Sequence, residues 1–272
     1  MFEAFVRRLR YPKHCEFCEG IDESVENPKH HPSYELTPKC NLRCAFCYSR
    51  VALEKGTAPQ PGYYGDWNPK AITISQFGEP FLAGSGELAR VIDELRRIFG
   101  DVRIDIQTNG TYDVSVLEGR ADIVMISLSA TRSYAKLTGV NALGSVLENI
   151  KRASTFAYTS VRAIYMPGIN DEELREVAEI ASEVDELFFQ PLSIYRKNLP
   201  LLKGLDLERA GNLYEFLKKA YELSEIAEVR VPGCLLLNLR NFLKEHDLEL
   251  LRFVNLSFGN VPLIRRERLF TL

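Results

Sequence analysis

Short apolar runs alternate with longer amphipathic stretches along the first three quarters of the chain. Runs of four to eight residues that are rich in β-branched side chains have the length and composition of buried parallel strands. Six such runs occur, beginning at Tyr34, Ala71, Val102, Ile123, Ser160 and Glu186. We therefore predict six strands that belong to one sheet.

The stretches between these runs have the periodicity of helices. One apolar face recurs at spacings of three and four residues between positions 84 and 100, formed by Leu88, Val91, Ile92, Leu95 and Phe99. Gly100 follows where a C-terminal cap is expected. Further along, Asn170 and Glu173 have the spacing of a capping box and predict the start of another helix.

Regular alternation of strands and helices predicts a parallel sheet with right-handed crossovers. A closed barrel of this kind usually has eight units, and this chain supplies six. We expect an α/β fold, a partial (βα)6 TIM-like barrel with parallel strands, in residues 33–204. Residues 1–32 form a short N-terminal extension with a C-x2-C motif, and residues 205–272 a C-terminal helical extension packed on the core.

The composition narrows the class of protein. The chain has 272 residues, of which 46% are hydrophobic and 26% are charged, as in ordinary globular domains. A net charge of −3 gives no reason to expect a nucleic-acid surface. The chain has no apolar stretch of spanning length and no apolar signal-peptide core at its start, so we expect a cytoplasmic protein without membrane contact. Clustered thiols in that compartment indicate metal rather than disulfides.

Half of the six cysteines crowd into one short segment, as Cys40, Cys44 and Cys47 with the spacing C-x3-C-x2-C. Thiolates suit iron–sulfur clusters, and a four-iron cluster held by three of them keeps one iron open for another ligand. The triplet follows the first strand, at the end of a barrel where catalytic groups gather. Two alternatives remain at this point: three small buried thiols, or a zinc site with one further ligand.

The segment "CNLRCAFC" resembles the signature of the radical S-adenosylmethionine (SAM) superfamily, and Phe46 matches the aromatic residue before the last cysteine. Further motifs follow in the family's order over most of residues 34–195. They are "GEP" (78–80), "TNG" (108–110), "LTGVN" (137–141) and "VRAIYMPGIND" (161–171). The last of these is similar to the fifth strand of the pyruvate formate-lyase activating enzymes.

The resemblance implies an enzyme with a [4Fe–4S] cluster on the cysteine triplet and with SAM bound to the open iron. One electron, from a donor such as flavodoxin or ferredoxin, would cleave SAM to methionine and a 5′-deoxyadenosyl radical. That radical would take hydrogen from an unidentified substrate. A short barrel with an open side suits a protein or peptide, and a small metabolite stays open as an alternative. A non-catalytic iron–sulfur electron carrier and a zinc-stabilised binding protein are the competing functions.

The resemblance also implies positions for SAM. Gly78, Glu79 and Pro80 would position its methionine group, and Arg162 would pair with its carboxylate. Further contacts are expected from Ser127, Ser129, Asn109, Gln107 and the segment 166–168, which would pack on adenine. One departure concerns "SLS" (127–129), where the activating enzymes carry Asp-Leu-Lys. Activation of a glycyl-radical enzyme is therefore doubtful.

Three cysteines remain outside the triplet, as Cys15, Cys18 and the distant Cys234. We predict that they converge on one place, because they flank the first and last parts of the barrel. A second metal there would be zinc, with one of His14, His30 and His31 as the fourth ligand, or an auxiliary iron–sulfur cluster. Such a metal could present an open coordination position near the substrate. The alternative is three unrelated reduced thiols.

Overall fold

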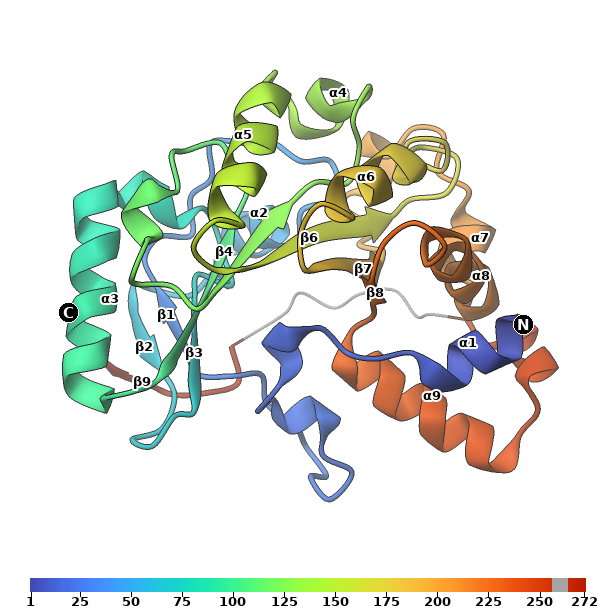
Figure 1. The fold of residues 1–272 in the computed structure, drawn as a ribbon, viewed down its shortest axis with the longest axis horizontal. Coiled ribbons are helices and arrows are strands. Elements are labelled where there is room, and N and C mark those ends of the chain that lie inside the picture. The colour runs from blue at the N-terminus through green and yellow to red at the C-terminus, as the bar shows by residue number, and fades with distance from the viewer. Residues whose placement is uncertain (256–263) are drawn as a thin grey trace.

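The chain forms one curved sheet that helices cover (Figure 1) in a computed structural model that describes residues 1–255 and 264–272. The six expected strands are all present and pair in parallel in the order β1, β3, β4, β5, β6, β7. Their bounds are Ser33–Glu35 (β1), Ala71–Ile74 (β3), Arg103–Thr108 (β4), Ile123–Ser127 (β5), Tyr158–Tyr165 (β6) and Glu186–Pro191 (β7). The predicted fold class, an α/β partial barrel, is confirmed.

Three further strands extend the sheet at its two edges. The short parallel strand β8 (Val229–Arg230) pairs with β7. At the other edge, β2 (Gly62–Tyr64) pairs antiparallel with β1, and β9 (Arg268–Phe270) pairs antiparallel with β2. The sequence predicted only the six parallel strands and a helical extension after 205, so these three strands were missed. Each is only two or three residues long, which is too short for a periodic pattern.

Helices follow most of the strands. The N-terminal segment contains α1 (Phe2–Arg8) and the short 3-10 helices η1 (Lys13–Cys15) and η2 (Glu19–Ile21). Within the barrel lie α2 (Tyr48–Glu54), η3 (Pro80–Ala83), α3 (Ser85–Phe99), η4 (Ser115–Leu117), α4 (Tyr134–Thr138), α5 (Leu143–Ala153), α6 (Leu174–Ala181) and η5 (Leu199–Leu201). The C-terminal part adds α7 (Leu207–Gly211), α8 (Leu213–Leu223), α9 (Gly233–Glu245) and η6 (Leu248–Phe253).

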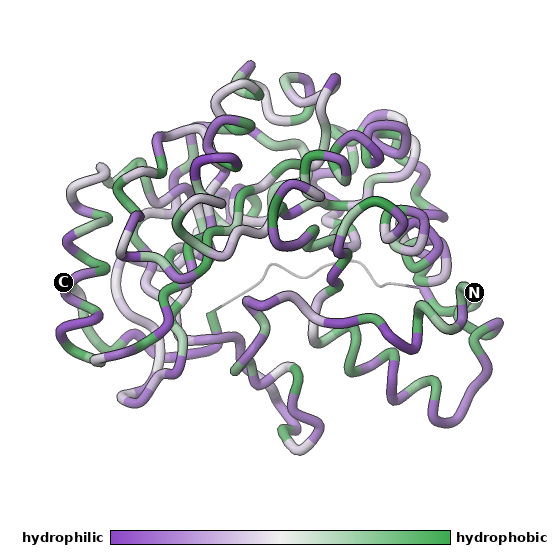
Figure 2. Tube along the Cα trace, viewed as in Figure 1, coloured by the Kyte–Doolittle hydropathy of each residue, from purple (hydrophilic) through white to green (hydrophobic). Residues whose placement is uncertain are grey.

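The main core lies between the outer face of the sheet and the helices. The apolar face predicted for α3 is buried there, with Leu88, Val91, Ile92 and Leu95 fully enclosed. Hydrophobic residues concentrate in the strands and on the helix faces that meet them, while the loops are largely hydrophilic (Figure 2). Burial of this kind is the main stabilising term for such a sheet.

The N-terminal segment crosses the amino ends of the strands. Its Lys13 backbone N–H bonds the Glu186 carboxylate at the start of β7, 3.1 Å away. Further along, Arg103 at the start of β4 donates to the carbonyl oxygens of His14 and Glu16. The segment and α9 lie together at the bottom of the view in Figure 1. We call this closed end of the barrel the floor, and the opposite end, at the carboxyl ends of the strands, the mouth.

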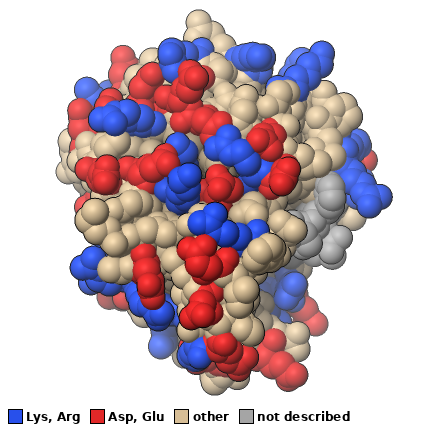
Figure 3. Space-filling view, turned by 90° about the vertical axis from the view of Figure 1, so that its right-hand side faces the viewer, with Lys and Arg blue, Asp and Glu red and all other residues tan. Residues whose placement is uncertain are grey.

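The division at residues 32 and 204 stays a prediction, and part of the last segment, 256–263, lies outside the described residues. No helix among the described residues combines the length and the apolar composition needed to cross a membrane. On the face in Figure 3, basic and acidic side chains are interspersed.

Candidate functional site

A single cavity at the mouth brings together most of the residues that the sequence singled out. It is lined by all three cysteines of the triplet and by side chains or backbone from five of the parallel strands and their loops. The sequence-predicted residues among its lining are Cys40, Cys44, Phe46, Cys47, Gly78, Gln107, Asn109, Ser127, Ser129 and Arg162. The cavity therefore joins soft sulfur ligands to polar and cationic groups in one space.

The cysteine loop is held by backbone hydrogen bonds that leave its sulfur atoms facing the cavity. The Leu42 N–H donates to Cys40 Sγ at 3.4 Å, and Cys47 caps α2 by accepting the Arg50 N–H at 3.4 Å. The amide of Asn109 also donates to Cys40 Sγ, at 3.5 Å. Donors of this kind stabilise sulfur as thiolate.

Helix α4 fixes the middle of this loop. The Arg43 N–H donates to the carbonyl oxygen of Thr138 at 2.7 Å, and the Ala45 N–H to that of Leu137 at 3.0 Å. Gly139 then ends α4 in the left-handed region, with a φ of 75°. The segment "LTG" thus has a physical role, because the last carbonyls of α4 hold the cysteine loop in place.

Cys44 and Cys47 are half-buried, whereas Cys40 is exposed. Partial loss of solvation raises the pKa of Cys40, Cys44 and Cys47 above the ordinary value of a free thiol. The thiols are therefore neutral unless a cationic group binds them. A metal or cluster would displace the three protons, as is general for thiolate ligands.

The "GEP" loop packs directly on the segment before the cysteine triplet and on the start of α2. The Gly78 N–H donates to Ser49 Oγ at 2.9 Å, and the Glu79 N–H donates to the carbonyl oxygen of Lys39 at 2.8 Å. A φ of 71° places Gly78 in the left-handed region, which glycine adopts without strain. Gly78 lines the cavity, whereas Glu79 and Pro80 lie behind it.

The Glu79 side chain ties this loop to the end of β4. It is fully buried and accepts hydrogen bonds from Thr108 Oγ1 at 2.8 Å and from the Asn109 N–H at 2.7 Å. Burial raises the pKa of Glu79 to about 7. Glu79 therefore positions two loops of the site without facing the cavity itself.

Arg162 brings a positive charge into the cavity without a matching negative one. Its guanidinium donates to the amide oxygens of Gln107 at 2.6 Å and Gln190 at 3.3 Å, and its buried Nε atom has no partner. No carboxylate of the described residues lies within ion-pair distance of it. A buried guanidinium that keeps a free donor is suited to an anionic group of a ligand.

Other predicted positions are placed differently. Ser127 and Ser129 both line the cavity, and Ser129 Oγ accepts the Ile164 N–H at 3.1 Å. Residues 166–168 lie outside the lining, with Met166 in a small apolar cluster and Gly168 against the carbonyl oxygen of Gly204. The predicted capping box is wrong, because the Asn170 and Glu173 side chains bond other segments of the mouth.

Several lining residues were missed by the sequence reading. Gln76, Gln190 and Tyr48 all face the cavity, and the Tyr48 hydroxyl donates to the carbonyl oxygen of Gln76. The period of two along β7 could have indicated Gln190. Arg162 on β6 pairs in register with Phe188 on β7, and Gln190 lies two residues further along, on the same face of the sheet. Gln76 and Tyr48 carry no comparable pattern.

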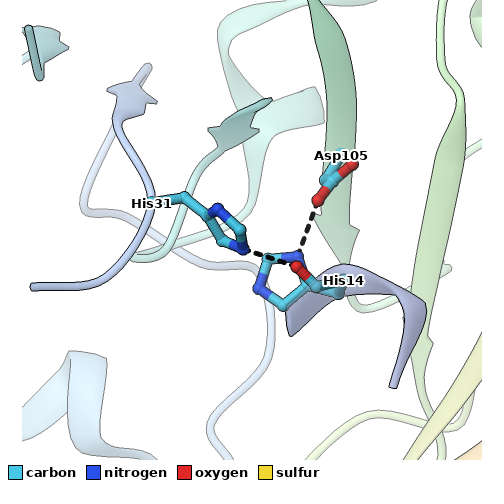
Figure 4. Close-up of side chains that lie close together, drawn as sticks. All are labelled: His14, His31 and Asp105. Atoms are coloured by element: carbon cyan, nitrogen blue, oxygen red, sulfur yellow. Dashed lines mark hydrogen bonds and ion pairs between the residues drawn. The ribbon is translucent and has the colours of Figure 1, made fainter. Parts of the chain in front are cut away.

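Below the cavity lies a histidine group in which His14 and His31 are buried close to Asp105 (Figure 4). Gln76 connects this group to the cavity. The Gln76 amide contacts His30 Nδ1 at 3.2 Å, and His30 Nε2 contacts His14 Nε2 at 3.3 Å. His14 Nδ1 then bonds Asp105 at 2.8 Å, and His31 Nε2 reaches the His14 carbonyl oxygen. The group is continuous from the cavity to the floor.

The histidine group is a closed hydrogen-bond network. Burial lowers the pKa of His14 to about 3 and of His31 to about 2, so these two rings are neutral, while the His30 ring is exposed. One consistent assignment has Gln76 donating to His30, His30 to His14, and His14 to Asp105. Although His14, His31 and Asp105 place three potential ligand atoms within 4.8 Å, the hydrogen bonds already occupy these atoms.

Comparison with known proteins places the chain in a family. Residues 34–181 match the model of the radical SAM superfamily. The uncharacterized protein MJ0804 of Methanocaldococcus jannaschii is 39% identical over 280 residues, which cover 97% of this chain and 94% of that protein.

More distant similarity extends to proteins with named activities. A probable GTP 3′,8-cyclase of Pyrococcus horikoshii is 27% identical over 161 residues, covering 56% of this chain and 52% of that protein. This chain therefore matches about half the length of the cyclase. The crystal structure of Streptococcus suis SuiB bound to SAM has a TM-score of 0.53 at 16% identity, over 73% of this chain and 49% of that one. At this identity the likeness shows the shared fold.

Proposed function

Because this chain belongs to the radical SAM superfamily, we propose that its mouth cavity binds a [4Fe–4S] cluster and SAM and uses them to take hydrogen from a substrate. The family membership makes the chain a radical SAM enzyme whose reaction is not established. The proposal of cluster and SAM binding rests on one observation: three thiols and a guanidinium without a carboxylate partner line the same cavity.

The residues present fit the cluster. Cys40, Cys44 and Cys47 offer three soft ligands, and among the described residues no fourth cysteine lines the cavity. One iron would thus remain free for a further ligand. When bound, the reduced cluster supplies the electron that cleaves the sulfonium of SAM. The Leu42, Arg50 and Asn109 N–H donors would stabilise the sulfur ligands and so tune the reduction potential.

The residues also fit SAM. The Arg162 guanidinium lines the cavity without a carboxylate partner and offers charge-assisted hydrogen bonds to a carboxylate of SAM. Ser127 and Gln107 lie beside it on the lining and can orient hydroxyl or carboxylate groups. Apolar lining from Phe46 and Leu192 limits the access of water, which protects a reactive intermediate. Gly78, Glu79 and Pro80 would position the methionine end of SAM through the backbone of their loop.

Replacing Arg162 with alanine tests the SAM assignment. Loss of a charge-assisted pair should weaken SAM binding by on the order of 2 kcal/mol, or about 30-fold in Kd. Arg162→Lys keeps the charge without the planar fork and should lose less. Anaerobic calorimetry of SAM binding to the reconstituted protein measures both.

Arg120→Ala is the matched control, because Arg120 pairs with Asp93 on the surface outside the cavity. Its SAM affinity should equal that of the unaltered protein. Equal affinity in the Arg162→Ala variant would show that another group holds the carboxylate.

We propose a protein or peptide as the substrate class. The N-terminal segment closes the floor through bonds to the starts of β4 and β7, so a substrate would enter from the mouth. The sheet stays open between its edge strands β8 and β9 within the described residues, and that opening would admit a bulky group. A small metabolite is the alternative.

Members of this superfamily generally need a reductant. We propose flavodoxin or ferredoxin as the donor, since either supplies single electrons at low potential. Cys15, Cys18 and Cys234 lie outside the mouth cavity and take no part in this proposal.

A further inference from the structure

Cys15, Cys18 and Cys234 come together at the floor, although more than 200 positions separate them. Two glycines allow the approach. A Cβ atom on Gly20 would lie 3.4 Å from Cys234 Cβ and 3.6 Å from Cys18 Sγ. A Cβ atom on Gly233 would lie 3.4 Å from Cys15 Sγ and only 2.4 Å from Ile21. The start of α9 and the C-x2-C segment are therefore packed against each other.

The three thiols are shielded to different degrees, because Cys15 is buried, Cys18 is half-buried and Cys234 is exposed. A metal that binds such thiols displaces their protons and takes them as thiolates.

The turn between Cys15 and Cys18 is strained. The Cys18 N–H bonds the Cys15 carbonyl oxygen at 3.0 Å, and Glu16 has φ −57° and ψ 132°. Phe17 has a φ of 71°, so the turn is of type II with a bulky residue where glycine is preferred. An L-residue there costs roughly 1–2 kcal/mol. Strain that persists in a surface turn points to a function for its geometry.

The third cysteine lies at the positive end of a helix dipole. Cys234 is the second residue of α9, a helix of 13 residues whose N-terminus has no side-chain cap. The positive end of a helix dipole stabilises a nearby anionic sulfur. Cys234 is also exposed, so that this corner of the site is open to solvent.

The spacing of the sulfur atoms fits a cluster better than a single zinc ion. Zinc with Zn–S bonds of about 2.3 Å draws its sulfur ligands to within about 4 Å of one another. Among the described residues, the three sulfur atoms of neither triplet all lie within 4.8 Å of one another. In an iron–sulfur cluster each thiolate binds a different iron, so wider spacing is expected.

Most ring nitrogens of the nearby histidines are already used. Those of His14 and His30 take part in the network that ends at Asp105, and His31 Nε2 bonds the His14 carbonyl oxygen. A Cys3His zinc site that used any of these nitrogens would have to break that network. We propose that Cys15, Cys18 and Cys234 bind a second iron–sulfur cluster, of the four-iron type, at the floor of the barrel.

The second cluster lies away from the mouth cavity. Strand β4 runs from the floor to the mouth. At its start, Arg103 bonds the backbone of His14 and Glu16. Just after its end at Thr108, Asn109 bonds Cys40. Six residues of strand span roughly 20 Å. The cluster would therefore join the N-terminal segment to α9 at the floor.

The test is metal content in a full-length variant that lacks the mouth triplet, Cys40→Ala with Cys44→Ala and Cys47→Ala. After anaerobic reconstitution with iron and sulfide, this variant should hold about four irons and four sulfides per chain. Adding Cys234→Ala should reduce both to well below one. One zinc per chain without sulfide, or no bound metal, would overturn the proposal. The result is independent of SAM chemistry, because this variant has no SAM-binding cluster.

The matched control is Asn238→Ala, added to the same triplet-free background. Asn238 is exposed and lies one turn after Cys234 on α9, outside the thiol group. It should retain the full iron content. Because Cys234 is exposed, its replacement should leave the melting temperature of the metal-free protein unchanged, which separates loss of a ligand from loss of the fold. Iron retained after Cys234→Ala would remove Cys234 from the site.

Discussion

A variant with alanine at Cys40, Cys44 and Cys47 should lose the mouth cluster and all detectable SAM cleavage. The three sulfur atoms are the soft ligands of the cavity, and the other polar side chains of its lining are amide, hydroxyl and guanidinium. None of those groups replaces a thiolate toward iron. Iron and sulfide should each fall by about four per chain relative to the unaltered protein. SAM binding should weaken as well, because the open iron is lost.

Circular dichroism and the melting temperature of the metal-free protein give the control for this variant. The cysteine loop is held by backbone bonds from Arg43 and Ala45 to α4, which do not involve sulfur. The fold should therefore survive the three replacements. SAM cleavage that persists in a folded triple variant would place the reducing cluster elsewhere in the chain.

Gly78→Ala should destabilise the protein by about 3 kcal/mol or more, because two penalties act together. The φ of 71° is unfavourable for alanine. The new methyl group would also lie 2.1 Å from the carbonyl oxygen of Thr37 and 2.6 Å from that of Lys39, both parts of the backbone. Since this segment leads into Cys40, the shift should also lower the iron content of the mouth site.

Gly119→Ala is the matched control for this change. Gly119 has the same φ as Gly78, 71°, but a Cβ atom there meets nothing within 4 Å. It should cost only the backbone strain, about 1 kcal/mol. Urea unfolding of the metal-free proteins measures the difference. Equal losses of unfolding free energy in the two variants would contradict the close packing of the "GEP" loop on the segment that leads into Cys40.

The parts of the fold that sequence predicts are those with a strong local signal. The six parallel strands are largely buried, and most contain β-branched or other apolar residues that can be recognised without knowledge of their partners. The cysteine triplet is equally local, because its ligands share one short loop. Edge strand β9 is different: it pairs with β2 some 200 positions away and has only three residues, so nothing local indicates it.

Site residues that depend on tertiary contacts were predicted less well. Glu79 stands in a motif that marks the SAM end of the cavity, yet its carboxylate points to Thr108 and Asn109 behind the lining. Asn170 has the spacing of a helix cap, but its amide bonds the carbonyl oxygens of Ser129 and Ile164. Such side chains serve partners that spacing along the chain cannot reveal.

The measurement that tests the central proposal most directly is the formation of 5′-deoxyadenosine from SAM. The unaltered protein is reconstituted anaerobically, reduced with dithionite and given SAM, with the triple Cys→Ala variant beside it. We predict 5′-deoxyadenosine from the first and none from the second. A reducible cluster in the unaltered protein without 5′-deoxyadenosine, or zinc in place of iron at Cys40, Cys44 and Cys47, would contradict the proposal.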